Sequence, residues 1–381
     1  RPIGWLKSED TAGKISIRIH KDDNDSGVFG EHKKRMAFGY SLHISGRKPI
    51  TIRNKIHTQP GIHESADKTL SWLRQNAFSP QSDGWFAAGY GAFRRLTRSN
   101  QAIVPTLDTP SRFTNFLSQF QEEDGLAAFQ QWIVYLDYRE AKENDTNAKR
   151  LREMGVTAIN ALLPTGVRYD SIDAEARILF DVNGTKVPTT GLSDGYRSVL
   201  ALAGDLVWRL ITAYPQSNNP LHETGVVLID ELDIHLHPVW QRNIAGWLRK
   251  QFPNIQFIVT THSPMVAAGA GEDSLTIKLL QNGSSPIPIT QSLFAMSVDD
   301  ILQSEAFGFL STYSPETEHK LKRLAELSIA DTSRSQKEEE EYRQLTLFVD
   351  EHNPFQLPDA SEDIQKKIIK QLESANNAIR S

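Results

Sequence analysis

The sequence contains no cysteine among its 381 residues. Disulfide bonds, catalysis by a thiolate and zinc sites with cysteine ligands are therefore excluded for these residues. Such a composition suits a reducing compartment, and we expect a cytoplasmic protein. A continuous apolar run of about 18 residues, the usual minimum for a transmembrane helix, is also absent, so we expect no membrane-spanning segment.

A strong excess of either charge is missing as well. The 42 Lys and Arg residues face 47 Asp and Glu residues, which gives a formal net charge of −5. Binding of DNA or RNA would therefore need a local basic patch, because the overall field does not attract nucleic acid. One candidate is GYGAFRRL with the two residues after it, a segment that contains Arg94, Arg95 and Arg98 and either lies near a ligand or DNA or is a solvated loop.

The first part of the chain has the pattern of β structure. Residues 14–56 contain KISIRIHK, MAFGYSLHIS and PITIRNKI, separated by Gly, Asp, Asn and Pro. Alternation of apolar and polar residues is typical of strands, and we expect an antiparallel sheet here. A helix near 66–76, a strand at 85–90 and a loop at 99–110 are predicted to follow.

Residues 111–165 are predicted to be mostly helical. Two apolar faces recur at helical spacing, and they comprise Leu126, Phe129, Trp132, Ile133 and Leu136, and then Leu151, Met154, Ala158, Ile159 and Leu162. The polar stretch KENDTNAK between them predicts a turn. A hairpin is expected next, because ARILFDV and TKVPT flank Asn183-Gly184, a strong hairpin-turn signal.

The next segment alternates helices with apolar strands. Its order is the loop GLSDGYRS, a helix to about Tyr214, the strand GVVLID, a helix over 238–251, and NIQFIVTTHSP. Two buried runs joined by a helix predict a βαβ unit with parallel strands. After Ala270 the pattern weakens, although SQKEEEEYRQL and IQKKIIKQLESANNAI predict two further helices.

Two carboxylates and a histidine stand where the predicted parallel strands end. Asp230 and Glu231 follow one apolar run, and His262 follows the next. Ligands of parallel sheets gather beyond the carboxyl ends of the strands, so we expect these side chains at one edge. One acid there can hold Mg²⁺, a second can orient a water toward a phosphate, and the histidine can contact the phosphoryl group. Alternatively, such acids only cap helices.

The motif LSDGYRS precedes a strongly apolar helix. Ser193 is a suitable N-cap residue, and Gly195 would let a ligand approach the backbone closely. A helix N-terminus presents free N–H groups and a partial positive charge, which suit a phosphate. Taken alone, however, the motif is more typical of an ordinary capped helix.

Together, LSDGYRS, GVVLIDELDIHLHP and QFIVTTHSP, in this order and spacing, resemble the second half of an ABC-class ATPase head of the RecF, SMC and OLD-like group. WFAAGYGAFRRL and HLHPVWQRNIAGWLRKQFPNIQFIVTTHSP further resemble compact bacterial anti-phage defence ATPases, those of the Septu system and of retrons with a Septu-like pair. The resemblance covers about residues 85–270. It implies an α/β fold with a mixed central sheet, an N-terminal antiparallel β subdomain and a helical subdomain.

This resemblance implies ATP and Mg²⁺ as cofactors and gives roles to the strand-end residues. Asp230 matches the Walker B acid that supports Mg²⁺, Glu231 matches the catalytic glutamate, and His262 matches the switch histidine.

The other matching positions concern the contact between two heads. Ser193 and Gly195, with the intervening Asp194 and the nearby Arg197, fall in the signature that contacts ATP bound to a partner head. Asp233 begins the D-loop, which lies at the interface between heads in the family.

The family's P-loop, GxxxxGK[ST], does not occur in the sequence. Gly13-Lys14 has no glycine five residues before it, and Ile15 replaces Ser or Thr. Because the P-loop holds the β- and γ-phosphates, half of the nucleotide site is missing from these residues. The chain also begins at Arg1 without methionine, so we expect a strand, P-loop and helix upstream of it. The alternative is a degenerate head that does not hold ATP.

The motifs divide the chain into four expected parts. They are the remainder of a β-rich ATPase lobe (1–110), a helical subdomain with the hairpin (111–190), the signature, Walker B and H-loop core (191–270) and a C-terminal helical docking region (271–381). Nothing after His262 has the pattern of a TOPRIM nuclease, so nuclease activity is not expected in this chain.

Three functional hypotheses follow from the resemblance. The first is a Mg²⁺-dependent ATPase that forms a homodimer or higher homo-oligomer through its heads. It would act in anti-phage defence by controlling a separate effector nuclease, for which an HNH enzyme is one candidate. The second is a RecF-like DNA repair ATPase that loads on duplex ends. The third is a non-hydrolysing scaffold with a degenerate head.

Overall fold

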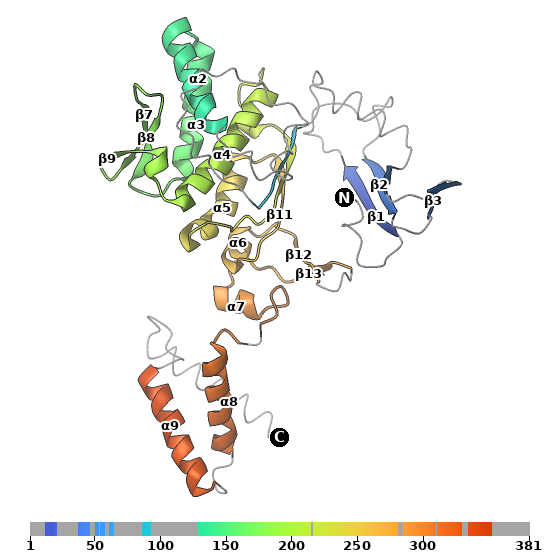
Figure 1. Cartoon of the computed structure of the whole chain (residues 1–381), viewed down its shortest axis with the longest axis vertical. Coiled ribbons are helices and arrows are strands. Elements are labelled where there is room, and N and C mark those ends of the chain that lie inside the picture. Colours follow the sequence, from blue (N-terminus) through green and yellow to red (C-terminus); the bar gives the residue numbers. More distant parts are fainter. Residues whose placement is uncertain are drawn as a thin grey trace. The chain divides into compact units, whose positions relative to one another are not determined.

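The computed structural model describes eleven stretches of the chain, which are residues 12–20, 37–45, 50–52, 54–57, 61–64, 86–92, 128–214, 216–280, 285–309, 311–329 and 334–352. The chain divides into two compact units, residues 1–301 and residues 302–381 (Figure 1). The four-part division expected from the sequence stays a prediction.

The alternating N-terminal segment forms an antiparallel sheet, as predicted. Its strands are β1 (Ala12–His20), β2 (Ala37–Ser45) and β5 (Gly61–Glu64), in the order β1-β2-β5. The run PITIRNKI is not one strand but a separate hairpin of β3 (Ile50–Ile52) and β4 (Lys55–His57). Asn54 between them has φ +64°, which reverses the chain. The helix predicted near 66–76 and the loop at 99–110 lie outside the described residues.

Three parallel strands form the sheet that matters for the site. They are β6 (Phe86–Tyr90), β10 (Gly225–Ile229) and β11 (Ile255–Val259), with β10 in the middle. The register pairs Ile229 with Tyr90 on one side and with Val259 on the other. All three strands therefore end at the same level. The predicted βαβ unit with parallel strands is confirmed.

Helices cover this sheet on one side (Figure 1). They are α2 (Ala128–Glu143), α3 (Thr146–Leu162), α4 (Asp194–Ala213) and α5 (Pro238–Gln251). Helix α4 is the centre of this layer, because it contacts β6, α2 and α3. Its apolar residues from Val199 to Val207 are buried almost without exception, as expected for a helix with neighbours on most sides.

A small antiparallel sheet follows α3. It consists of β7 (Val167–Ile172), β8 (Ile178–Val182) and β9 (Thr185–Pro188). Asn183 and Gly184 both have positive φ, which confirms the predicted two-residue turn. Strand β7 was not predicted, because the alternation in VRYD is short and an irregularity between Tyr169 and Ser171 interrupts it.

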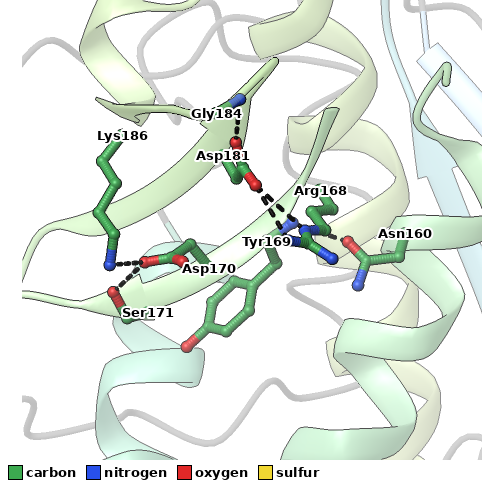
Figure 2. Close-up of polar contacts among 8 residues, drawn as sticks. All are labelled: Asn160, Arg168, Tyr169, Asp170, Ser171, Asp181, Gly184 and Lys186. Carbon is green, nitrogen blue, oxygen red and sulfur yellow. Dashed lines mark hydrogen bonds and ion pairs between the residues drawn. The ribbon is translucent and has the colours of Figure 1, made fainter. Parts of the chain in front are cut away.

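Polar contacts hold this sheet together and attach it to α3 (Figure 2). The Asn160 side chain of α3 accepts the Tyr169 N–H of β7 at 2.8 Å. Asp181 accepts hydrogen bonds from the Arg168 guanidinium at 3.1 Å and from the Gly184 N–H at 2.7 Å. These hydrogen bonds help to hold β7 in its sheet and against α3.

Short elements complete the first unit. They are the 3₁₀ turns η3 (Thr189–Gly191) and η4 (Pro220–His222), α6 (Pro264–Gly269), β12 (Thr276–Lys278), β13 (Ile287–Ile289) and, across the boundary between the units, α7 (Val298–Gln303). None of the described helices combines the length and apolar composition that crossing a bilayer requires.

The second unit contains a pair of helices, α8 (Pro315–Ile329) and α9 (Gln336–His352). Helix α9 contains the predicted SQKEEEEYRQL helix, whereas α8 was not predicted. Arg323 of α8 donates to both carboxylate oxygens of Glu341 in α9, each at 3.0 Å. The helix predicted from IQKKIIKQLESANNAI lies outside the described residues.

Two helical glycines offer a test of the packing in the helical layer. A Cβ added at Gly155 of α3 would lie 2.7 Å from the buried Trp132 ring, whereas one added at Gly246 of α5 would meet nothing closer than 4.0 Å. We expect Gly155→Ala to destabilise the protein by about 1–3 kcal/mol. The matched Gly246→Ala should stabilise it by up to about 1 kcal/mol. Chemical denaturation of the intact gene product measures both, and equal effects would contradict the described packing.

Candidate active site

The main-chain pairing of the parallel sheet continues one residue beyond the strands. The Asp230 N–H donates to the Tyr90 carbonyl at 2.8 Å, and the Thr260 N–H donates to the Ile229 carbonyl at 2.9 Å. Asp230 and Thr260 therefore stand beside each other at the carboxyl edge. The Thr260 hydroxyl donates to Asp230 Oδ1 at 2.5 Å and fixes that carboxylate.

Glu231 leaves the sheet in an unusual backbone conformation. Its φ is +50°, in the left-handed region, which costs a residue with a side chain about 1–2 kcal/mol. The Thr260 hydroxyl accepts the Glu231 N–H at 2.8 Å and offsets part of this cost. Strain of this kind, held by specific bonds, is common where a side chain must be aimed at a reacting group.

The Glu231 side chain meets His262. Glu231 Oε1 lies 3.1 Å from His262 Nε2, and the two side chains are 25% and 84% exposed. Both groups thus face solvent at the same edge as Asp230. The structure therefore brings together the three residues that the sequence places at the strand ends, while their catalytic and metal-binding roles stay predictions.

Asp233, which is expected from the sequence to begin a D-loop, holds the main chain at His262. Its Oδ1 accepts a short hydrogen bond from the Thr261 hydroxyl and a second one from the His262 N–H at 3.2 Å. Asp233, which is predicted to lie at the interface between heads, therefore fixes the main chain of His262 in its own chain.

Gln241 of α5 and Ser263 extend this network. Gln241 Nε2 donates to the Leu236 carbonyl at 2.9 Å, and the Ser263 hydroxyl donates to Gln241 Oε1 at 2.7 Å. Ser263 also accepts the N–H groups of Met265 and Val266 and so caps α6. The loop after β10 and the loop after β11 are therefore tied to each other and to two helices.

The motif LSDGYRS leads into α4 as predicted, while its role as a signature motif stays a prediction. Ser193 occupies the N-cap position with an extended backbone, but its hydroxyl makes no capping hydrogen bond. A Cβ at Gly195 would lie 3.3 Å from the His235 carbonyl, so the first turn of α4 lies against residues 235–237 of the same chain, within the predicted D-loop. Asp194 and Arg197 form an ion pair across this turn.

The donor groups at this edge suit a nucleotide with Mg²⁺. Magnesium that arrives with phosphate oxygens needs only one or two protein carboxylates. Asp230 offers an exposed carboxylate, oriented by Thr260 and next to Glu231. The first turn of α4 offers backbone N–H groups that the Ser193 hydroxyl leaves uncapped, which suits an anion.

Three residues of this network, Thr260, Gln241 and Ser263, were not predicted from the sequence. A signal existed for Thr260, because it is the first polar residue after the apolar run 257–259, as Asp230 is after the run 226–229. Gln241 and Ser263 had no comparable signal, since their partners are a main-chain carbonyl and each other's side chains.

Comparison with protein families identifies the class. The family described as "AAA domain, putative AbiEii toxin, Type IV TA system" matches residues 44–268, more than half of the chain. The chain belongs to this family of ATPase domains.

Individual relatives come from bacterial retron and Septu systems. "Retron Ec83 probable ATPase" of Escherichia coli is 51% identical over 106 residues, which are 28% of this chain and 19% of that protein. "Septu protein PtuA" of Bacillus mycoides (strain KBAB4) is 30% identical over 266 residues, which are 68% of this chain and 34% of that protein. The matched region thus spans a fifth to a third of these relatives. The resemblance inferred from the motifs is confirmed.

Among solved structures, the SMC head domain from Thermotoga maritima is similar with a TM-score of 0.39 and 13% identity, over 74% of this chain and 76% of that chain. The α/β assignment rests on the strands and helices described above rather than on this likeness.

The bridging role of Thr260 leads to a test on the intact gene product. Thr260→Val keeps the side-chain shape but removes both hydrogen bonds, so we expect ATP turnover to fall roughly 100-fold through misplacement of the two acids. Thr260→Ser should stay near the wild-type rate. The control is Thr157→Val, which removes an exposed hydroxyl bonded to the Glu153 carbonyl at 2.7 Å on α3. Similar rates for Thr260→Val and Thr157→Val would contradict the role of Thr260.

Proposed function

We propose that this chain is part of a Mg²⁺-dependent ATPase whose heads close in pairs on ATP and which controls a separate nuclease in anti-phage defence. The observation that carries the proposal is the Glu231–His262 pair beside Asp230 at one edge of a parallel sheet. ATP with Mg²⁺ would supply the phosphoanhydride bond and a cation that neutralises its charge.

Glu231 and His262 have the geometry for complementary tasks. A glutamate that lies 3.1 Å from an imidazole can orient a water and take up its proton, while the imidazole donates to a phosphoryl oxygen. The left-handed backbone at Glu231 turns its side chain away from the strand direction and toward His262. In this proposal Asp230 holds the cation, with its second oxygen kept in place by Thr260.

The start of α4 would serve a second copy of the chain. Ser193 is exposed and its hydroxyl does not cap its own helix, so it is available to an anion that another head presents. The D-loop lies directly against Gly195, so both predicted interface motifs occupy one region of the molecule. We therefore infer a homodimer, or a higher oligomer built from such pairs, in which each nucleotide lies between two chains.

The proposed role in anti-phage defence rests on the names of the similar proteins. The names of the matched proteins are those of retron ATPases and of the Septu protein PtuA. By analogy, the ATPase would act in the cytoplasm and restrain or position an effector nuclease encoded separately, with the HNH type as our candidate. A contact with DNA or RNA through Arg94, Arg95 and Arg98 stays a prediction, because these residues lie outside the described ones.

The decisive variant of the intact gene product is Glu231→Gln. Loss of the carboxylate should lower ATP turnover by at least about 100-fold, because water is no longer activated. Light scattering with ATP and Mg²⁺ should show an accumulated dimer, since binding persists without hydrolysis. Glu272→Gln, at an exposed acid of a loop, is the matched control and should change neither quantity. Turnover at the wild-type rate in Glu231→Gln would refute the catalytic assignment.

A further inference from the structure

A buried polar cluster lies between β6 and α4, inside an otherwise apolar core. Tyr90, the last residue of β6, and Asp205, in the middle of α4, are both completely buried. Arg209, one turn further along α4, donates through Nε to Asp205 Oδ2 at 2.5 Å, and its side chain is 12% exposed. A phenol, a carboxylate and a guanidinium thus share one site away from solvent.

The cluster is linked to both parts of the proposed active site, the acidic edge of the sheet and the start of α4. On the sheet side, the Tyr90 carbonyl accepts the N–H of Asp230 at 2.8 Å. On the helix side, Asp205 lies eleven residues after Asp194 on the same helix, which is three turns from the signature end. One group of side chains therefore joins the strand that supports the acidic edge to the helix that begins with the signature motif.

The hydrogen bonding within the cluster is incomplete. Tyr90 interacts electrostatically with both Asp205 and Arg209, but among the described residues neither its hydroxyl nor Asp205 Oδ1 has a hydrogen bond of regular distance and angle, although both atoms are buried. Burial raises the pKa of Tyr90 well above its ordinary value, and the Asp205 carboxylate raises it further, so the phenol keeps its proton and remains a donor. A donor and an acceptor therefore lie near each other with capacity for one more bond.

Stability alone does not explain such a cluster. Apolar side chains of similar volume often serve a core as well as or better than a buried ion pair. A polar cluster, in contrast, favours only those positions of a helix in which its donors and acceptors meet, whereas apolar surfaces tolerate several. Small helix shifts between two such positions are a common way to connect distant sites.

We propose that Tyr90, Asp205 and Arg209 form a positioning device that sets α4 relative to the carboxyl edge of the sheet. In it, a shift of α4 when two heads close pairs the Tyr90 hydroxyl with Asp205 Oδ1. Tyr90 transmits this pairing to Asp230 through its main-chain hydrogen bond. The inference rests on the proposed function and extends it, because it links the signature of a head to the acids of that same head.

The test uses Tyr90→Phe in the intact gene product, which removes one hydroxyl and keeps the ring. We expect kcat for ATP hydrolysis to fall about tenfold, with KM for ATP unchanged, because the device acts on the positions of the acids rather than on nucleotide affinity. Tyr214→Phe is the matched control, since its hydroxyl donates to the Thr224 carbonyl at 2.6 Å beside the other end of α4. It should leave kcat unchanged, and the melting temperatures of both variants show whether they fold.

A double-mutant cycle separates this role from simple packing. Asp205→Asn should lower kcat by itself, and adding Tyr90→Phe should lower it no further, because the two residues act through one contact. Independent, multiplicative losses would overturn the inference, as would a kcat for Tyr90→Phe equal to that of Tyr214→Phe. If Asp205→Asn does not fold, the comparison of the two tyrosine variants decides alone. A wild-type protein without ATP turnover would instead refute the proposed function, and this inference with it.

Discussion

The candidate site depends on the register of three parallel strands. β6, β10 and β11 end at the same level, and the main-chain ladder then adds one more step on each side of Ile229. That step places Asp230 and Thr260 beside each other. A shift of β11 by one residue would turn its alternate side chains to the opposite face and would separate the two loops that carry Glu231 and His262.

Beyond the ends of the strands, side-chain hydrogen bonds rather than main-chain pairing connect the two loops. The Thr260 hydroxyl both donates to Asp230 and accepts from Glu231, and Asp233 accepts from the main chain of His262. Each of these bonds crosses from the loop after β10 to the loop after β11. The two loops therefore behave as one rigid support, which is the condition for holding Glu231 in a left-handed conformation with its carboxylate close to His262.

Much of this arrangement could be predicted from the sequence, because buried strands, helix periodicity and strand-end acids leave local signals. Asp230, Glu231 and His262 follow apolar runs, and Asn183-Gly184 marks its turn. The predictions failed where the determinant is a polar contact or a single backbone angle rather than an apolar pattern. Strand β7 is held by Asn160 and by its pairing with β8, and PITIRNKI is divided by the backbone of Asn54. Thr260 and Gln241 likewise gain their importance only from the loops that they join.

Helix α4 connects the proposed contact with a second head to the buried polar cluster. Its first turn lies against His235, its N-cap Ser193 makes no capping hydrogen bond, and its middle buries the Asp205–Arg209 pair next to the strand that supports Asp230. An α-helix has a regular rise per residue and moves largely as a stiff rod. A displacement of its N-terminus is therefore transmitted along its length. In the proposed function, a ligand that a second head presents to the first turn of α4 would therefore act on the buried cluster as well. In that proposal, α4 would link the contact with a second head to the position of the acids.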